Sequence, residues 1–202
     1  MIIGIDFDNT IVCYDEAFHR AACEGGLIPA DIPATKEQVR DYLRNIGQED
    51  SWTELQGYVY GSRMDMVEPF SGVTECIRFL MSQGADVYII SHKTLYPYRG
   101  ARYNLHDAAR SWLLKSCFLR DAGLDMHQVF FETTKDEKLA RIGNMGCTHF
   151  IDDLPEIFSA DGFPPQTTPL LFAPENQAGG KGMLTFVSWK DIAAYFRGSD
   201  AG

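Results

Sequence analysis

The sequence predicts an α/β protein, built as a three-layer αβα sandwich with a Rossmann-like parallel sheet and a small helical cap. Two observations predict this fold. Short apolar runs alternate with segments of helical periodicity, which is typical of buried parallel strands covered by helices. Three of these runs also end at polar residues, as expected where parallel strands place a binding site at one edge of their sheet.

Five apolar runs predict strands, at residues 2–7, 87–91, 129–132, 149–152 and 169–172. Segment 72–84, between the first two runs, carries apolar residues at helical spacing and ends at a glycine, so it is predicted to be the crossover helix. A loop rich in Tyr, Arg and Gly follows at 94–104, and a strong amphipathic pattern predicts one helix over 105–122. Right-handed crossovers would then give a layered sheet.

The connection between the first strand and its crossover helix is unusually long. Residues 14–68 contain two or three further helical patterns, at about 16–24, 36–46 and 52–60. Glycines and prolines separate these patterns. We therefore expect a core domain comprising residues 1–13 and 69–202, with a small helical cap at 14–68 inserted after the first strand.

Composition and charge exclude several classes of function. The 202 residues are 45% hydrophobic and 23% charged, as in an ordinary globular protein, and the net charge of -10 argues against a nucleic-acid binder. The five cysteines lack metal-ligand or redox spacing. No membrane-spanning run is visible, and Asp6 interrupts the apolar start before a signal-peptide core could form. We expect a cytoplasmic protein that binds neither nucleic acid nor membrane.

The first predicted strand ends in Asp6-Phe7-Asp8-Asn9-Thr10. Two carboxylates that lie two residues apart on a turning backbone can approach one point, where a bound cation relieves their repulsion. Magnesium suits such a site because it prefers oxygen ligands and commonly joins carboxylates to a substrate phosphate. Taken alone, the aspartates fit a turn whose side chains cap backbone amides equally well.

The same segment resembles DxDxT, the first motif of the haloacid dehalogenase (HAD) superfamily, and matches to its three other motifs follow in order. Ser91, at the end of the second run, resembles the hydroxyl residue of the second motif. Lys138 or Lys135 resembles the lysine of the third, which stands at the start of a helix. Asp152 and Asp153 resemble the acid pair of the fourth. Together the matches span most of the chain.

The choice of lysine stays open on sequence grounds. Thr134 and Glu137 fit a capping box, so both lysines fall near the start of one helix. We prefer Lys138 because it directly precedes Leu139 and can share the inward side of that helix. The other matches have plain alternatives as well, since Ser91 could cap a turn and the acid pair could cap a helix at 154–158.

The resemblance implies a magnesium-dependent phosphatase that hydrolyses a small-molecule phosphate monoester through an aspartyl-phosphate. Asp6 would attack phosphorus, and Asp8 would act as general acid and then general base. Mg²⁺ would be held by Asp6, by the backbone carbonyl of Asp8 and by Asp153, with Asp152 acting from the outer shell. The phosphate would be held by Ser91, Thr10, the motif lysine, and the amides of Phe7, Asp8 and His92.

Two alternatives share these residues or this fold. A phosphotransferase or phosphomutase would pass the phosphoryl group to a sugar hydroxyl instead of water. A non-catalytic binding protein with a HAD fold would more often have lost one of the acids, and all of them are present. Nucleotides, sugar phosphates and other small phosphate esters fit the motifs equally well as substrates.

Overall fold

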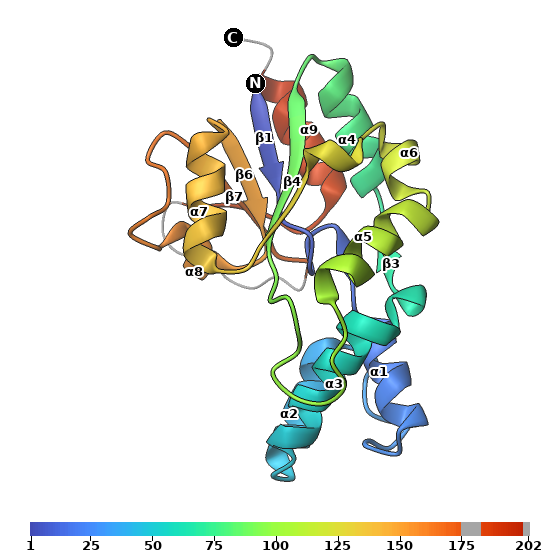
Figure 1. The fold of residues 1–202 in the computed structure, drawn as a ribbon. Coiled ribbons are helices and arrows are strands. Elements are labelled where there is room, and N and C mark those ends of the chain that lie inside the picture. Colours follow the sequence, from blue (N-terminus) through green and yellow to red (C-terminus); the bar gives the residue numbers. More distant parts are fainter. Residues whose placement is uncertain (175–182, 200–202) are drawn as a thin grey trace. The chain divides into compact units, whose positions relative to one another are not determined.

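A computed structural model describes residues 1–174 and 183–199 of the chain. Its centre is a six-stranded parallel sheet in the order β5-β4-β1-β6-β7-β8 (Figure 1). The strands are β1 (Ile2–Ile5), β4 (Asp86–His92), β5 (Val129–Glu132), β6 (His149–Asp152), β7 (Thr168–Phe172) and β8 (Leu184–Phe186). Because β1 lies between β4 and β6, the strand order reverses beside it, at the point where α/β sheets bind ligands.

The predicted fold class is confirmed, and the five predicted strands are β1, β4, β5, β6 and β7. The sixth strand, β8, was not predicted. It has three residues and, within the described ranges, pairs with β7 alone, and its residues Leu184 and Thr185 are exposed. An edge strand this short and open lacks the apolar run that marked the buried strands.

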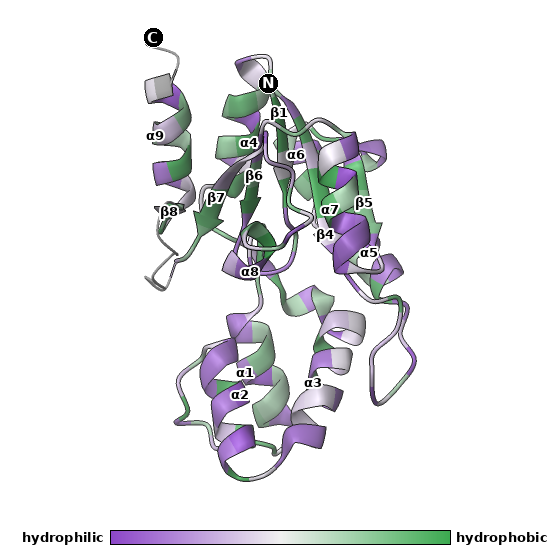
Figure 2. Ribbon diagram, turned by 90° about the vertical axis from the view of Figure 1, so that its left-hand side faces the viewer, coloured by the Kyte–Doolittle hydropathy of each residue, from purple (hydrophilic) through white to green (hydrophobic). Residues whose placement is uncertain are grey.

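Helices cover both faces of the sheet (Figure 1). On one face, α7 (Lys135–Asn144) and α8 (Pro155–Phe158) contribute Leu139, Ile142 and Ile157 to a cluster with Ile90 and Phe150. On the other face, α4 (Val73–Ser82) packs against α6 (Phe118–Ala122) and α9 (Trp189–Ser199). The central strands are predominantly hydrophobic, as expected for strands buried between two layers of helices (Figure 2).

The chain divides into two compact units. The core unit, which holds the sheet, comprises Met1–Ile11, Pro69–Lys93 and Cys117–Gly202. The helical unit comprises Val12–Glu68 and Thr94–Ser116. It contains the helices α1 (Asp15–Glu24), α2 (Lys36–Asn45), α3 (Glu49–Ser62) and α5 (Leu105–Lys115) and the 3₁₀ turn η1 (Met64–Met66). The remaining short elements are β2 (Val12–Cys13) and β3 (Glu68–Pro69), which pair with each other, and the turn η2 (Met126–Gln128).

The three helical patterns predicted within 14–68 correspond to α1, α2 and α3. The unit that holds these helices differs from the predicted boundaries, because it also takes in Thr94–Ser116, which the prediction assigned to the core. Packing explains the difference. The side chains of Pro97 and Tyr103 lie against Gly57 and Gly61 of α3, and the guanidinium of Arg99 forms ion pairs with acids of the same helix.

The single helix predicted over 105–122 is wrong, because the structure has two helices there, α5 and α6. The break falls at Cys117, whose φ of 61° is left-handed and so cannot continue a helix. The two helices also belong to different units. The indole of Trp112 in α5 donates to the carbonyl of Val67, whereas α6 packs on α4.

None of the helices in the described part of the chain has both the length and the apolar character needed to cross a membrane.

Candidate functional site

Asp6 directly follows the central strand β1, and its amide extends the sheet by donating to the carbonyl of Ile151 at 2.9 Å. Its side chain is buried. Ser91 Oγ and Lys138 Nζ both donate to Asp6 Oδ1, at 2.8 and 2.6 Å. Among the described residues no group donates a hydrogen bond to the other oxygen, Asp6 Oδ2. Every fully buried side-chain oxygen in this part of the chain has a hydrogen-bond partner, so Oδ2 must be exposed to solvent. One oxygen of Asp6 is therefore fixed and the other is accessible.

Lys138 joins two of the acids. The predicted capping box of Thr134 and Glu137 is present and starts α7, which turns Lys138 inward and leaves it 1% exposed. Its ammonium donates to Asp6 Oδ1 and Asp152 Oδ2, at 2.6 Å each. Lys135 instead donates to the carbonyl of Glu156 at 2.9 Å, in an exposed position. The structure thus places Lys138, and not Lys135, among the acids.

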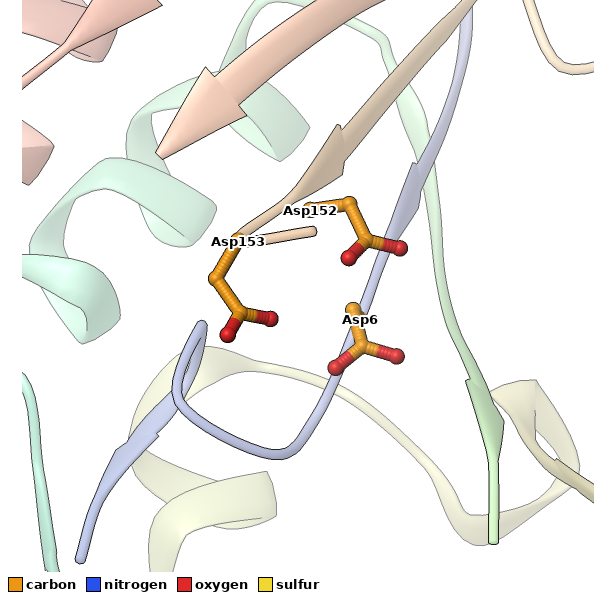
Figure 3. Close-up of side chains that lie close together, drawn as sticks. All are labelled: Asp6, Asp152 and Asp153. Carbon is orange, nitrogen blue, oxygen red and sulfur yellow. The ribbon is translucent and has the colours of Figure 1, made fainter. Parts of the chain in front are cut away.

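The acid pair Asp152 and Asp153 lies at the end of β6. Asp152 is fully buried, and its other oxygen, Oδ1, accepts from the amide of Leu154 at 3.0 Å. Asp153 is partly exposed and accepts from the hydroxyl of Thr10 at 3.3 Å. Carboxylate oxygens of Asp6, Asp152 and Asp153 all lie within 4.8 Å of one another (Figure 3). A cluster of this kind has the all-oxygen character that divalent magnesium prefers.

Burial and neighbouring charges shift the pKa values of Asp6 and Lys138 in this cluster. The pKa of Asp6 is raised to about 7, mainly by burial and also by the charges of Asp152 and Asp8, although Lys138 acts in the opposite direction. For Lys138, burial alone would lower the pKa, but the carboxylates of Asp6 and Asp152 outweigh it and raise the pKa above its usual value. Lys138 is therefore charged, whereas Asp6 binds a proton more readily than an ordinary carboxylate.

Asp8 does not belong to this three-carboxylate cluster. Its two oxygens accept from Lys93 Nζ at 3.0 and 2.7 Å. Lys93, which is only 4% exposed, was missed by the sequence analysis. A signal was available, because residues two apart on a strand point to the same face, and Lys93 stands two residues after Ser91.

Thr10 and His92 were also predicted to hold phosphate, and this stays a prediction. Thr10 is fully buried, and besides its bond to Asp153 its carbonyl accepts from the indole of Trp189 at 3.1 Å. These contacts fix the loop that carries Asp6 and Asp8. His92 ends β4 and is exposed. Desolvation of its imidazole and the charge of Lys138 lower the pKa of His92.

No protein-family model matches the sequence, and no curated protein matches it. Solved structures do match. A HAD-superfamily hydrolase from Ehrlichia chaffeensis has a TM-score of 0.61 at 14% identity, over 98% of this chain and 96% of its own. A HAD-family hydrolase from Deinococcus radiodurans R1, solved with bound phosphate and sodium, has a TM-score of 0.60 at 16% identity with the same coverage. The chain has the HAD fold.

Other proteins with the HAD fold carry different names. The protein tyrosine kinase PtkA of Mycobacterium tuberculosis is similar to this chain with a TM-score of 0.61 at 14% identity, over 96% of both chains. A shared fold does not define the reaction, so the function of this HAD-fold chain has to be argued from its site. The four motif matches lie at the ends of β1, β4 and β6 and at the start of α7.

Proposed function

We propose that the protein is a magnesium-dependent phosphatase that hydrolyses a small-molecule phosphate monoester through an aspartyl-phosphate on Asp6. The observation that carries the proposal is the convergence of the carboxylates of Asp6, Asp152 and Asp153 within 4.8 Å, with Lys138 bound between two of them. Several structural neighbours are described as hydrolases or phosphatases, which supports the same class of reaction.

The residues present fit a divalent cation. Four carboxylates, those of Asp6, Asp8, Asp152 and Asp153, stand against two ammonium groups, which leaves two formal negative charges. Asp6, Asp153 and the backbone carbonyl of Asp8 would hold Mg²⁺. Asp152 would act from the outer shell, since its oxygens already accept from Lys138 and Leu154. When bound, Mg²⁺ would supply positive charge to the phosphoryl oxygens.

In the first half-reaction, the accessible Oδ2 of Asp6 attacks phosphorus and the bond from phosphorus to the ester oxygen breaks. The leaving oxygen takes its electron pair and receives a proton from Asp8, which gives a free alcohol and a phosphorylated Asp6. Lys138 and Ser91 bind Oδ1 of Asp6, so they orient Oδ2 for attack. Ser91 and Lys138 would also donate to phosphoryl oxygens as negative charge shifts.

In the second half-reaction, water attacks the phosphorus of the aspartyl-phosphate. The oxygen of water bonds to phosphorus, one of its protons goes to the carboxylate of Asp8, and the bond to Asp6 breaks with its electron pair returning to the Asp6 carboxylate. Inorganic phosphate leaves and Asp8 is protonated again for the next substrate. General acid–base work of this kind contributes about 10²–10⁴-fold to a rate.

We assign the helical unit the role of the cap. The chain enters this unit at Val12, two residues after Thr10, and again at Thr94, directly after Lys93. A cap that excludes bulk water favours a small soluble phosphorylated metabolite over a protein surface. The net charge of -10 argues against nucleic acid as the substrate and so favours a small metabolite.

The test is phosphate release from para-nitrophenyl phosphate and from a panel of phosphorylated metabolites, with Mg²⁺ and with EDTA. Wild-type protein is expected to turn over only with Mg²⁺, and Asp6→Asn is expected to be inactive because the amide cannot attack phosphorus. Turnover that survives in Asp6→Asn would exclude the proposed nucleophile. Product analysis with sugar phosphates separates hydrolysis from transfer to a second hydroxyl, and no turnover on any substrate would favour a binding protein.

A further inference from the structure

Lys93 lies outside the four motif matches, yet it is built into the site. It directly follows β4, and its amide donates to the carbonyl of Glu132 at 2.8 Å, which extends the pairing of β4 with β5. Its side chain is 3% exposed, and its ammonium contacts both oxygens of the Asp8 carboxylate. The sheet therefore fixes the backbone position of Lys93, and the ion pair with Asp8 fixes the position of its ammonium group.

A buried ion pair of this kind affects the orientation of the Asp8 carboxylate more than it affects the stability of the fold. Burying a lysine removes its charge from water, and the attraction of its partner often does no more than offset that cost. A single ammonium that contacts both carboxylate oxygens does, however, restrict the rotation of the Asp8 side chain. It also offsets a negative charge that would otherwise repel the other acids of the site and an incoming phosphoryl group.

We propose that Lys93 is a positioning residue that holds the ionised Asp8 carboxylate where it accepts a proton from water, and so sets the rate of aspartyl-phosphate hydrolysis. This inference rests on the proposed function. In the step concerned, water bonds to phosphorus, its proton goes to Asp8, and Asp6 leaves with the electron pair. A carboxylate offers about four acceptor sites, so two bonds from Lys93 are compatible with accepting a third from water.

The effect of losing Lys93 is expected to fall mainly on this second step when the substrate is an aryl phosphate. para-Nitrophenolate is a good leaving group and departs without a proton from Asp8. The value of kcat/KM reports the steps up to release of that group, whereas kcat includes hydrolysis of the aspartyl-phosphate. A defect confined to hydrolysis therefore lowers kcat and KM together and leaves kcat/KM almost unchanged.

The experiment compares wild type, Lys93→Met and Lys93→Arg by stopped-flow release of para-nitrophenolate with saturating Mg²⁺. Lys93→Met is expected to show a burst of about one para-nitrophenolate per active site, a kcat about 10- to 100-fold lower, and a kcat/KM within about threefold of wild type. Acid quenching is expected to trap more phosphorylated protein than in wild type. Lys93→Arg keeps the charge and is expected to recover part of kcat. Lys135→Met is the matched control and is expected to behave as wild type.

A double variant separates positioning from a general loss of structure. Because Lys93 acts through Asp8, Lys93→Met added to Asp8→Asn is expected to slow hydrolysis of the trapped intermediate no further. Lys93→Gln, which keeps the polarity of the side chain without its charge, replaces Lys93→Met if circular dichroism shows that the methionine variant does not fold.

The possible outcomes separate this inference from the proposed function. Equal losses of kcat and kcat/KM without a burst, or additive losses in the double variant, would overturn the role of Lys93 while leaving Asp6 as the nucleophile. An inactive wild type, or an active Asp6→Asn, would overturn the proposed function and this inference with it.

Discussion

Buried charge governs the site at the scale of single residues. Lys138 contacts Asp6 and Asp152 at 2.6 Å, and Lys93 contacts Asp8 at 2.7 Å. Each of these three acids contacts a lysine, which offsets part of the negative charge of the site. Burial outweighs the attraction of Lys138 and, together with the charges of Asp152 and Asp8, raises the pKa of Asp6 to about 7, so the lysines offset the charge of the acids only in part.

Lys138→Met tests the compensation directly. Removing the ammonium leaves two buried carboxylates facing each other, so the free energy of unfolding is expected to fall by roughly 3–5 kcal/mol in urea denaturation without metal. Phosphatase activity is expected to be lost as well. Lys135→Met is the matched control, since the ammonium of Lys135 donates to the carbonyl of Glu156 in an exposed position, and it is expected to change stability by less than about 1 kcal/mol. Equal effects of the two substitutions would contradict the site geometry.

Burial also predicts which cysteines react. It raises the pKa of the Cys76 thiol to about 12 and that of Cys147 to about 11, so both remain protonated between about pH 7 and pH 9. Cys13, Cys23 and Cys117 are partly exposed. Iodoacetamide is therefore expected to label these three in the native protein and to spare the buried pair, as read by peptide mass spectrometry. Labelling of Cys76 as fast as that of Cys23 would show that the core opens readily.

At the scale of elements, α3 shows how the segment Thr94–Ser116 joins the helical unit. An added Cβ at Gly61 would lie 2.3 Å from Tyr103, and one at Gly57 would lie 2.6 Å from Pro97. Glycine normally weakens a helix, but here it lets the segment after β4 approach the helix axis closely. The glycines thus lower the intrinsic stability of α3, but they allow Pro97 and Tyr103 to pack closely against it.

Gly61→Ala reverses the usual effect of this substitution. Alanine favours helix by about 1 kcal/mol, but the clash with Tyr103 is expected to lower the free energy of unfolding by roughly 1–3 kcal/mol. Gly198→Ala is the control, because a Cβ there meets nothing within 4 Å. Thermal unfolding followed by circular dichroism is expected to give a lower Tm for the first variant and an unchanged or higher Tm for the second. A stabilised Gly61→Ala variant would refute the close approach.

The elements also show what sequence can and cannot predict. Apolar runs marked five strands because those strands are buried, and the short exposed β8 gave no such signal. The break between α5 and α6 was hidden because a cysteine, rather than a glycine, takes the left-handed conformation. The motif acids and Ser91 could be predicted from the order of the four motifs along the sequence. Lys93 lies outside these motifs, so their order does not reveal it, and its spacing from Ser91 is the signal that was available. Its partner Asp8 could not be predicted, because Asp8 lies 85 residues away in the chain and is brought close by the pairing of β1 with β4.

At the scale of the whole molecule, the chain passes between the two units four times, after Ile11, Glu68, Lys93 and Ser116. The first and third of these passages come within two residues of Thr10 and directly after Lys93. The proposed catalytic segments and the helical unit are therefore linked through short covalent connections. The groups that would hold the metal all belong to the core unit.

Metal binding is expected to stabilise the whole fold. A ligand that binds only the native state raises the free energy of unfolding by about 2.7 kcal/mol at a concentration about 100 times its Kd. Mg²⁺ at that excess is therefore expected to raise the Tm of the wild type by roughly 5 °C or more in a thermal-shift assay. Asp153→Asn is expected to lose most of this shift, and the exposed Asp161→Asn is expected to keep it. An equal shift in both variants would place the metal elsewhere.

The most direct measurement is the chemical identity of the residue that carries the phosphoryl group. Protein that is turning over substrate would be quenched in acid, reduced with borohydride and analysed by peptide mass spectrometry. Borohydride converts an aspartyl-phosphate into homoserine, so the peptide that contains position 6 is expected to carry this change, and protein quenched without substrate is expected not to. Modification at Asp8 or Asp152 instead, or full turnover with no modified aspartate in rapidly quenched samples, would contradict Asp6 as the group that attacks phosphorus.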